Sequence, residues 1–254
     1  MHAIIAHVLE KPTHFALVHP EFMLTFEQKE KLNRLSNQLV SGVPLPYLIG
    51  NQEFYGINFY VTPDVLIPRP ETEIMIDTFN KWQKNSNFVK DIADVGTGSG
   101  CIGVTLLKLH PALRIIATDI SFSALQVATK NSKRYIPNES ITFLNVDLLS
   151  GIETQFDCIC ANLPYIPSKR LQNLKVSAYE PNIALDGGSD GLDLIRRLVY
   201  QSSSLLKTGG ALMLEIDHTQ VEEIRQIATK LFHQTSIKII NDYSDFSRVI
   251  ILEK

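Results

Sequence analysis

From residue 90 onward, short apolar runs alternate with longer segments in which apolar residues recur every three or four positions. The runs predict buried strands, and the spacing between them predicts amphipathic helices. We expect strands at seven places: Ile92–Val95, Arg114–Thr118, Ile141–Asn145, Phe156–Ala161, Ala211–Ile216, Ile237–Asn241 and Val249–Leu252. No helical segment separates the last two, so they should form a terminal hairpin that brings one antiparallel element into the sheet.

Helices are expected between the strands, at Ile102–His110, Ser123–Arg134, Leu192–Leu206 and Gln220–His233. Strands that alternate with helices in this way are typical of an α/β fold with a doubly wound sheet. Gly209-Gly210 should mark the turn into the fifth strand.

The first 73 residues follow a different pattern. Residues 3–9 and 26–40 have helical spacing, and Thr25 with Gln28 three residues later predicts a capping box. Aromatic and β-branched residues around Gly56 predict a hairpin. We therefore expect three units: a short helical domain over residues 1–42, a linker with a β-hairpin over residues 43–73, and the α/β domain over residues 74–254.

Two prolines shape the end of this linker. Pro68 and Pro70 restrict the backbone to an extended path. A helix of about ten residues should then begin near Glu71 and Glu73, where carboxylates suit the helix dipole, and run through Trp82.

A glycine-rich turn follows the first strand of the α/β domain. Asp94-Val-Gly-Thr-Gly-Ser-Gly100 has a G-x-G-x-G spacing, so its third glycine comes one residue earlier than in the dinucleotide fingerprint. Glycines allow a tight turn and the close approach of a ligand. A plain strand-to-helix turn could have the same composition, so the loop alone does not establish a site.

Acidic residues end the next two strands. Asp119 lies nineteen residues after Gly100, where a carboxylate can accept hydrogen bonds from both ribose hydroxyls of a nucleoside, although it could instead cap the next helix. Asp147 can accept from an adenine amine while Leu148 contacts the ring. The three elements describe a nucleoside site without a pyrophosphate cradle, which S-adenosylmethionine fits better than a dinucleotide.

The fourth strand ends in Asn162-Leu-Pro-Tyr165. The Asn162 side-chain oxygen and the Leu163 carbonyl can each accept one N–H of a planar –NH₂, Pro164 holds Leu163 extended, and Tyr165 offers a ring for stacking or packing. Acceptors on both hydrogens would stabilise the positive charge that develops on a nitrogen during methylation. No general base is evident, so the proton is expected to leave to water. Adenine and glutamine both carry such an amine.

The bulk properties narrow the class of protein. The chain has 254 residues, a net charge of −3 and 44% hydrophobic residues, enough for a full α/β core but without the basic excess of a general polyanion binder. We expect no membrane span, signal peptide or metal site. Of the three cysteines, Cys101, Cys158 and Cys160, the last two should share one strand face and are interpreted as buried apolar side chains rather than a metal or redox pair. Without a disulfide framework, a cytoplasmic location fits best.

Several motifs occur in an order that resembles the release-factor glutamine methyltransferases (PrmC/HemK). They span residues 42–50 with Phe54, 66–73, 94–100, 162–167 and 179–192, with Glu215, Gln220, Asp242 and Arg248 as later fragments. Residues 67–73, Ile-Pro-Arg-Pro-Glu-Thr-Glu, are the most specific. The resemblance implies a class I methyltransferase (Rossmann-like) fold, with S-adenosylmethionine as cofactor.

The resemblance also implies a reaction and its residues. The family methylates the glutamine amide in the Gly-Gly-Gln motif of class I peptide chain release factors, its protein partners. Asn162, Leu163, Pro164 and Tyr165 would hold that glutamine and carry the catalysis, and Arg69 and Glu71 would help close the site, although a structural salt bridge could also explain the latter pair. Cofactor contacts would come from Gly96, Thr97, Gly98, Ser99, Gly100, Asp119, Asp147, Leu148 and Asn162.

This chain departs from the family in two ways. Leu163 stands where the family usually has a second proline, and Asn-Leu-Pro-Tyr also resembles the motif of ribosomal RNA adenine dimethyltransferases. The helical domain, which helps the family dock release factors, is shorter here by one or two helices. The alternative hypotheses are an adenine amino methyltransferase acting on DNA or RNA, and a non-catalytic binding protein. We expect a monomer without direct nucleic-acid binding.

Overall fold

Seven strands form one sheet in the order β5-β4-β3-β6-β7-β9-β8. The computed structural model describes residues 1–254 except 87–88, 137–139 and 233–235. All neighbours in the sheet are parallel except β9, which is antiparallel to both β7 and β8 and so confirms the terminal hairpin. The strands are β3 (Asp91–Val95), β4 (Arg114–Asp119), β5 (Ile141–Asn145), β6 (Phe156–Ala161), β7 (Leu206–Glu215), β8 (Ser236–Asn241) and β9 (Ser247–Glu253).

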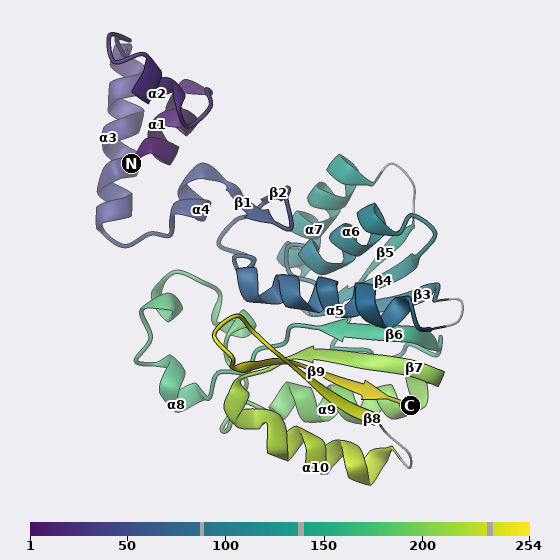
Figure 1. The fold of residues 1–254 in the computed structure, drawn as a ribbon. Coiled ribbons are helices and arrows are strands. Elements are labelled where there is room, and N and C mark those ends of the chain that lie inside the picture. Colours follow the sequence, from purple (N-terminus) through teal and green to yellow (C-terminus); the bar gives the residue numbers. More distant parts are fainter. Residues whose placement is uncertain (87–88, 137–139, 233–235) are drawn as a thin grey trace.

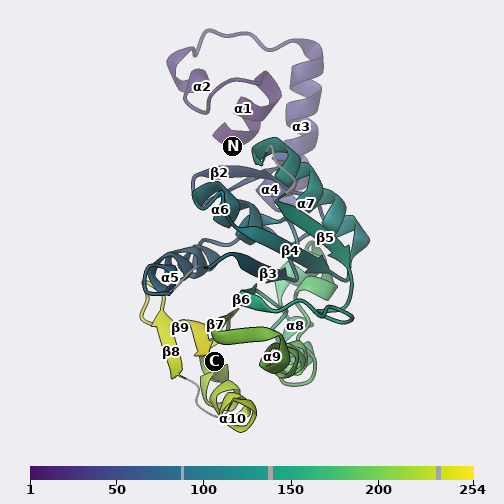
Figure 2. The same ribbon diagram turned by 90° about the vertical axis from the view of Figure 1, so that its right-hand side faces the viewer.

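Helices cover both faces of this sheet, as expected for a doubly wound fold (Figures 1 and 2). Side chains alternate along β6: Cys158 and Cys160 pack with α5 and α6, whereas Ile159 and Ala161 pack with α9 and α10. The two sulfur atoms lie 3.7 Å apart and are buried, which confirms that they share a face. The helices are α5 (Glu73–Gln83), α6 (Cys101–Leu109), α7 (Phe122–Tyr135), α8 (Ser168–Leu171), α9 (Asp193–Leu205) and α10 (Val221–Leu231).

The predicted turn at Gly209-Gly210 is wrong, because these glycines lie inside β7. That strand begins at Leu206, directly after α9. Its pairing with β6 shifts register between Phe156 and Cys158, and Gly209 has a φ of +78°. Glycine permits this left-handed backbone, so the pair lies in an irregularly paired stretch of the strand rather than in a turn that precedes it. The predicted end of the last helix, His233, lies outside the described residues.

The N-terminal helices stand apart from the sheet (Figure 1). The capping box is confirmed: the Gln28 N–H donates to Thr25 Oγ1 at 3.2 Å, and the Thr25 N–H donates to Gln28 Oε1 at 2.9 Å. Ile4, Val8 and Leu35 form their small core. The helices are α1 (His2–Leu9), α2 (Phe15–Val18), α3 (Phe26–Val40) and α4 (Leu45–Ile49), of which α2 and α4 were not predicted.

The linker forms the predicted hairpin, made of β1 (Asn51–Phe54) and β2 (Ile57–Tyr60). A completely buried side chain on α7, Asn131, fixes it to the α/β domain. Asn131 accepts from the Tyr60 N–H at 2.8 Å and donates to the carbonyl oxygens of Tyr60 and Ser99, at 2.9 and 2.8 Å. One amide thus joins the hairpin, α7 and the glycine-rich loop.

After the hairpin, the chain reaches the sheet through the proline segment. A short 3-10 helix η1 (Pro70–Thr72) leads into α5, which confirms the predicted helix start. This path carries the 64–72 segment along the carboxyl ends of the strands, where it forms part of a cavity.

Candidate active site

A cavity of about 560 Å³ opens at the carboxyl ends of β3, β4 and β6. This is where open α/β sheets bind their ligands, and the volume is typical of a small-molecule site. Its wall includes eleven of the residues expected from the sequence to hold a cofactor or substrate: Arg69, Gly96, Thr97, Gly98, Ser99, Asp119, Asp147, Leu148, Asn162, Leu163 and Pro164. Residues far apart in the chain are therefore brought to one place.

The glycine-rich loop needs its glycines. Gly96 and Gly98 have φ values of +69° and +54°, which side-chain-bearing residues rarely adopt. A Cβ on Gly96 would lie 3.0 Å from Leu163 Cδ2, so the loop and the Asn162-Leu163 segment pack against each other. The third glycine, Gly100, is the N-cap of α6 and does not line the cavity among the described residues.

Asp119 braces this loop. Its Oδ2 accepts from the Gly98 N–H at 2.9 Å, and its Oδ1 accepts from the Ser121 N–H at 2.8 Å. Burial raises the pKa of Asp119, and these two backbone donors lower it in part. The side chain that caps α7 is Ser121, which accepts from the Ala124 N–H at 3.2 Å. The capping alternative for Asp119 is therefore wrong.

Asp94 supports the loop from beneath. Its Oδ2 accepts from the Thr97 hydroxyl at 2.6 Å and from the Gly103 N–H at 3.0 Å, while Oδ1 has no partner among the described residues. The side chain is completely buried, and this burial raises its pKa to about 6. Above this pKa, the buried negative charge of Asp94 lowers the stability of the folded protein.

Asp94→Asn should therefore stabilise the protein at pH 8, because an amide oxygen can still accept from Thr97 and Gly103 without a buried charge. The pKa of Asp94 in the folded protein lies above its ordinary value of 3.8. Ionisation of Asp94 therefore destabilises the parent protein increasingly as pH rises from 3.8 to about 6, and the full loss of stability is present above pH 6. The gain in free energy of unfolding should be about 1 kcal/mol larger at pH 8 than at pH 5. Urea unfolding of both proteins measures it, and a gain that is independent of pH would contradict the buried charge.

The third strand end contributes Asp147 and Leu148. Leu148 has a φ of +52°, a strained conformation for a side-chain-bearing residue and one that clusters at functional sites. Asp147 Oδ2 accepts from Arg197 Nη2 at 2.6 Å, and Arg197 also lines the cavity. Arg197 therefore holds Asp147 at the wall of the cavity, and no described residue donates a hydrogen bond to Asp147 Oδ1.

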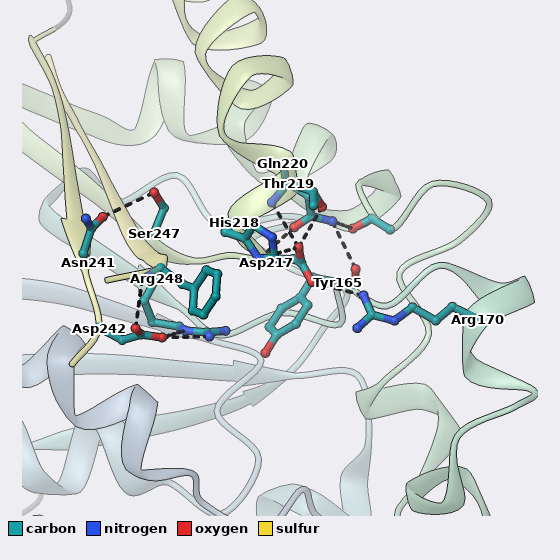
Figure 3. Close-up of polar contacts among 12 residues, drawn as sticks. Tyr165, Arg170, Asp217, His218, Thr219, Gln220, Asn241, Asp242, Ser247 and Arg248 are labelled. Carbon is teal, nitrogen blue, oxygen red and sulfur yellow. Dashed lines mark hydrogen bonds and ion pairs between the residues drawn. The ribbon is translucent and has the colours of Figure 1, made fainter. Parts of the chain in front are cut away.

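The residues of the Asn162-Leu-Pro-Tyr165 segment do not all face the cavity. Asn162, Leu163 and Pro164 line the cavity, with Asn162 Nδ2 3.0 Å from Thr72 Oγ1. Tyr165 is not among the described lining residues; its hydroxyl lies 3.3 Å from Glu215 Oε1, near Arg248 (Figure 3). Burial raises the pKa of Tyr165, and the negative charge of Glu215 raises it further. The geometry supports packing of this ring, not stacking on a ligand in the cavity.

Arg69 and Glu71 lie in different places relative to the cavity. Arg69 lines the cavity and pairs with Glu180, whose Oε2 also accepts from the Ile67 N–H at 3.1 Å. Glu71 is exposed and does not belong to the described wall of the cavity. The pair does not form the salt bridge considered from the sequence; Glu180 takes the place of Glu71.

Four residues of the site have contacts that the sequence did not predict: Thr72, Glu180, Arg197 and Glu215. Glu180 and Glu215 are acids with at most 5% exposure, which is rare for unpaired carboxylates. The resembling motifs contain Glu180 and Glu215, but their partners lie more than a hundred residues away in sequence. No sequence spacing connects such pairs.

The described residues contain no group of three or more histidine, cysteine, aspartate or glutamate side chains placed to hold a metal ion. Within the same residues, no helix has the length and apolar character needed to cross a membrane.

Solved structures with the same fold are methyltransferases. The ribosomal protein L11 methylase from Lactobacillus delbrueckii subsp. bulgaricus has a TM-score of 0.54 at 21% identity, over 73% of this chain and 80% of that one. The 16S rRNA N2 G1207 methyltransferase of T. thermophilus, solved with AdoMet and guanosine, has a TM-score of 0.57 at 15% identity, over 80% and 49%. They confirm the class I methyltransferase fold.

Sequence comparisons are more specific. Two family models match, "Methyltransferase small domain" over residues 70–178 and "PrmC N-terminal domain" over residues 1–50. The release factor glutamine methyltransferase of Koribacter versatilis is 36% identical over 94% of this chain and 85% of its own length. That of Bacillus anthracis is 32% identical over 98% and 90%. The chain belongs to the release factor glutamine methyltransferase family.

Proposed function

We propose that this protein transfers a methyl group from S-adenosylmethionine to the side-chain amide nitrogen of the glutamine in the Gly-Gly-Gln motif of class I peptide chain release factors. The observation that carries the proposal is the position of Asn162: its amide lies in the wall of the cavity that the glycine-rich loop and Asp119 also line. Membership in the family supports glutamine over adenine as the methylated group.

The wall of the cavity fits a nucleoside sulfonium. Asp119 presents ionisable oxygens beside the loop, where ribose hydroxyls can donate to them, and Asp147 keeps one oxygen for an amine. The space left by the missing Cβ atoms of Gly96 and Gly98 admits the methionine end of the molecule. When bound, S-adenosylmethionine supplies an electrophilic methyl group.

Asn162 and Leu163 supply the acceptors for the glutamine amide. Asn162 Oδ1 takes one N–H, and the Leu163 carbonyl takes the other, held in direction by Pro164. An amide nitrogen is a poor nucleophile because its lone pair is delocalised. Acceptors placed on both hydrogens stabilise the charge that develops on that nitrogen, and fixed alignment supplies the rest of the rate enhancement. Leu163 can replace the family's proline because its part is played by a backbone carbonyl.

The N-terminal helices are the proposed docking surface for the release factor. Residues 1–50 match the N-terminal domain model of the family. Several large apolar side chains there are exposed, among them Met23, Phe26 and Val40, each at least 75% exposed. Exposed apolar surface of this kind marks interaction sites.

A methyl-transfer assay tests the proposal directly. Purified protein and S-adenosylmethionine with a radiolabelled methyl group should label a class I release factor, and a release factor with Gln→Ala in the Gly-Gly-Gln motif should stay unlabelled. Transfer to both proteins would place the methyl group elsewhere. Absence of transfer, with cofactor binding intact by calorimetry, would overturn the proposal.

The same assay separates the adenine alternative. Total RNA and DNA are added in place of the release factor, and the labelled product is treated with nuclease or protease. Label that disappears with nuclease would show a nucleic-acid substrate, which the net charge of −3 does not favour.

A further inference from the structure

A buried chain of hydrogen bonds leads from Asn162 into the core. Asn162 Nδ2 lies 3.0 Å from Thr72 Oγ1, and Thr72 Oγ1 lies 2.6 Å from Glu215 Oε2. Thr72 is 2% exposed and Glu215 1%, so neither group has bulk water as a substitute partner. The three residues come from the end of β6, from η1 and from the end of β7.

A count of protons fixes the direction of this chain. While Glu215 is ionised, it only accepts hydrogen bonds, so the single hydroxyl proton of Thr72 points to it. The Thr72 oxygen then faces Asn162 with lone pairs only. The Asn162 atom beside it must therefore be the –NH₂ group, because two acceptors would repel each other. Asn162 Oδ1, which receives no hydrogen bond from a described residue, is left for a donor in the cavity.

We propose that Thr72 is a positioning residue, and Glu215 its anchor, which together hold the Asn162 amide with its oxygen toward the substrate. The inference rests on the proposed function, since it concerns the acceptor for the substrate amine. The oxygen and the –NH₂ group of the Asn162 side chain are nearly equivalent in shape, so without this constraint the amide could rotate by 180°. The flipped amide would then point its –NH₂ group at the N–H of the substrate, and no hydrogen bond would form.

Surrounding groups keep Glu215 in place. The Tyr165 hydroxyl lies 3.3 Å from its other oxygen, and Arg248 lies nearby, bound to Asp242 with an Nη2–Oδ2 distance of 3.0 Å (Figure 3). Burial raises the pKa of Glu215, whereas the Thr72 hydrogen bond, the positive charge of Arg248 and the Tyr165 hydrogen bond lower it. This gives Tyr165 a part in the site although it does not line the cavity.

Thr72→Val tests the inference because valine keeps the shape of threonine and removes the hydroxyl. We expect kcat for release-factor methylation to fall about 10-fold, the effect of losing one hydrogen bond from the transition-state acceptor, with an unchanged dissociation constant for S-adenosylmethionine. Thr72→Ser should restore kcat to within about threefold of the parent. The control is Thr105→Val, since Thr105 is equally buried and its hydroxyl has no partner among the described residues.

A double variant separates positioning from a general structural effect. If Thr72 acts only through Asn162, then Asn162→Ala combined with Thr72→Val should be no slower than Asn162→Ala alone. Losses that multiply, or a Thr72→Val enzyme as active as the parent, would overturn the inference while leaving the proposed function intact.

The pH dependence tests the anchor. Protonated Glu215 can donate to Thr72 and no longer dictates where the hydroxyl proton points, so the kcat ratio of parent to Thr72→Val should shrink as pH is lowered from 8 to 5. The charged and titratable groups that face Glu215 are Arg248, Tyr165, Glu71 and Cys101. These groups and the other acids of the site are present in both the parent and Thr72→Val. Their own titration therefore changes both kcat values in the same way and largely cancels in the kcat ratio. A constant ratio would contradict the anchor.

A measurement without release factor keeps the two proposals distinguishable. The side-chain ¹⁵N–¹H₂ signals of Asn162, identified by their absence from Asn162→Ala, should show slow hydrogen exchange for one proton in the parent and faster exchange in Thr72→Val. If the parent fails to methylate release factors, the proposed function falls, and this spectrum still decides the orientation. Equal exchange in both proteins would overturn the inference.

Discussion

Asn162→Ala is expected to lower kcat for release-factor methylation by on the order of 10²-fold, because it removes an acceptor that acts most strongly when charge develops on the substrate nitrogen. The dissociation constant of S-adenosylmethionine should change little, since Asp119, Asp147 and the glycine-rich loop remain. Single-turnover labelling of a release factor measures the first quantity, and calorimetry measures the second.

Asn85→Ala is the matched control for this experiment. Asn85 is an exposed asparagine just beyond the end of α5, and among the described residues its side chain donates one hydrogen bond, to the Lys81 carbonyl. Its loss should leave both constants near those of the parent. An Asn162→Ala enzyme with parental kcat would show that another group accepts from the substrate amine.

Asp119→Ala is expected to raise the dissociation constant of S-adenosylmethionine by on the order of 10²-fold. Hydrogen bonds to a charged acceptor contribute roughly 1.5–3 kcal/mol, and the variant loses the proposed acceptor for the ribose hydroxyls. It also frees the N–H groups of Gly98 and Ser121, which loosens the loop that the ligand contacts. Calorimetric titration of the purified variant gives the constant directly.

Asp77→Ala is the matched control, because it removes an aspartate carboxylate that does not line the described wall of the cavity. Asp77 lies on α5 and accepts from the Tyr55 hydroxyl at 2.8 Å, away from the described wall of the cavity. Its removal should leave cofactor affinity near that of the parent. Parental affinity in Asp119→Ala would refute the ribose assignment.

Much of the site followed from strand ends alone. The strands of the α/β domain were placed to within two residues, apart from the start of β7, because buried strands carry continuous apolar runs. Parallel strands end at one edge, so Asp119, Asp147 and Asn162 could be brought together without knowledge of any contact. This part of the site could be predicted from local signals, namely an apolar run and the polar residue that follows it.

The contacts that orient these side chains could not be predicted in the same way. The Thr72–Glu215 hydrogen bond joins residues 143 apart, and the Arg69–Glu180 pair joins residues 111 apart. Neither has a periodicity that a sequence pattern would show. The irregular pairing at Gly209 was also missed, because it depends on the register of β6 against β7 and not on either sequence alone.

Tyr165 shows the same limit on a single residue. Its place in the motif beside Asn162 predicted a ring that could either stack on a substrate or pack in the core. The Tyr165 hydroxyl instead lies 3.3 Å from Glu215 Oε1, and its ring lies beside Arg248 (Figure 3). Adjacent residues in an extended segment face opposite ways, and only the surrounding fold decides which of them reaches the cavity.

The buried amide of Asn131 has a consequence for how this family could diverge. It fastens the hairpin to the glycine-rich loop at a point C-terminal to all four leading helices. Helices could therefore be gained or lost at the start of the chain without disturbing the geometry of the cavity at the strand ends. If these helices dock the release factor as proposed, selection on the partner and selection on the chemistry would act on separate stretches of the gene.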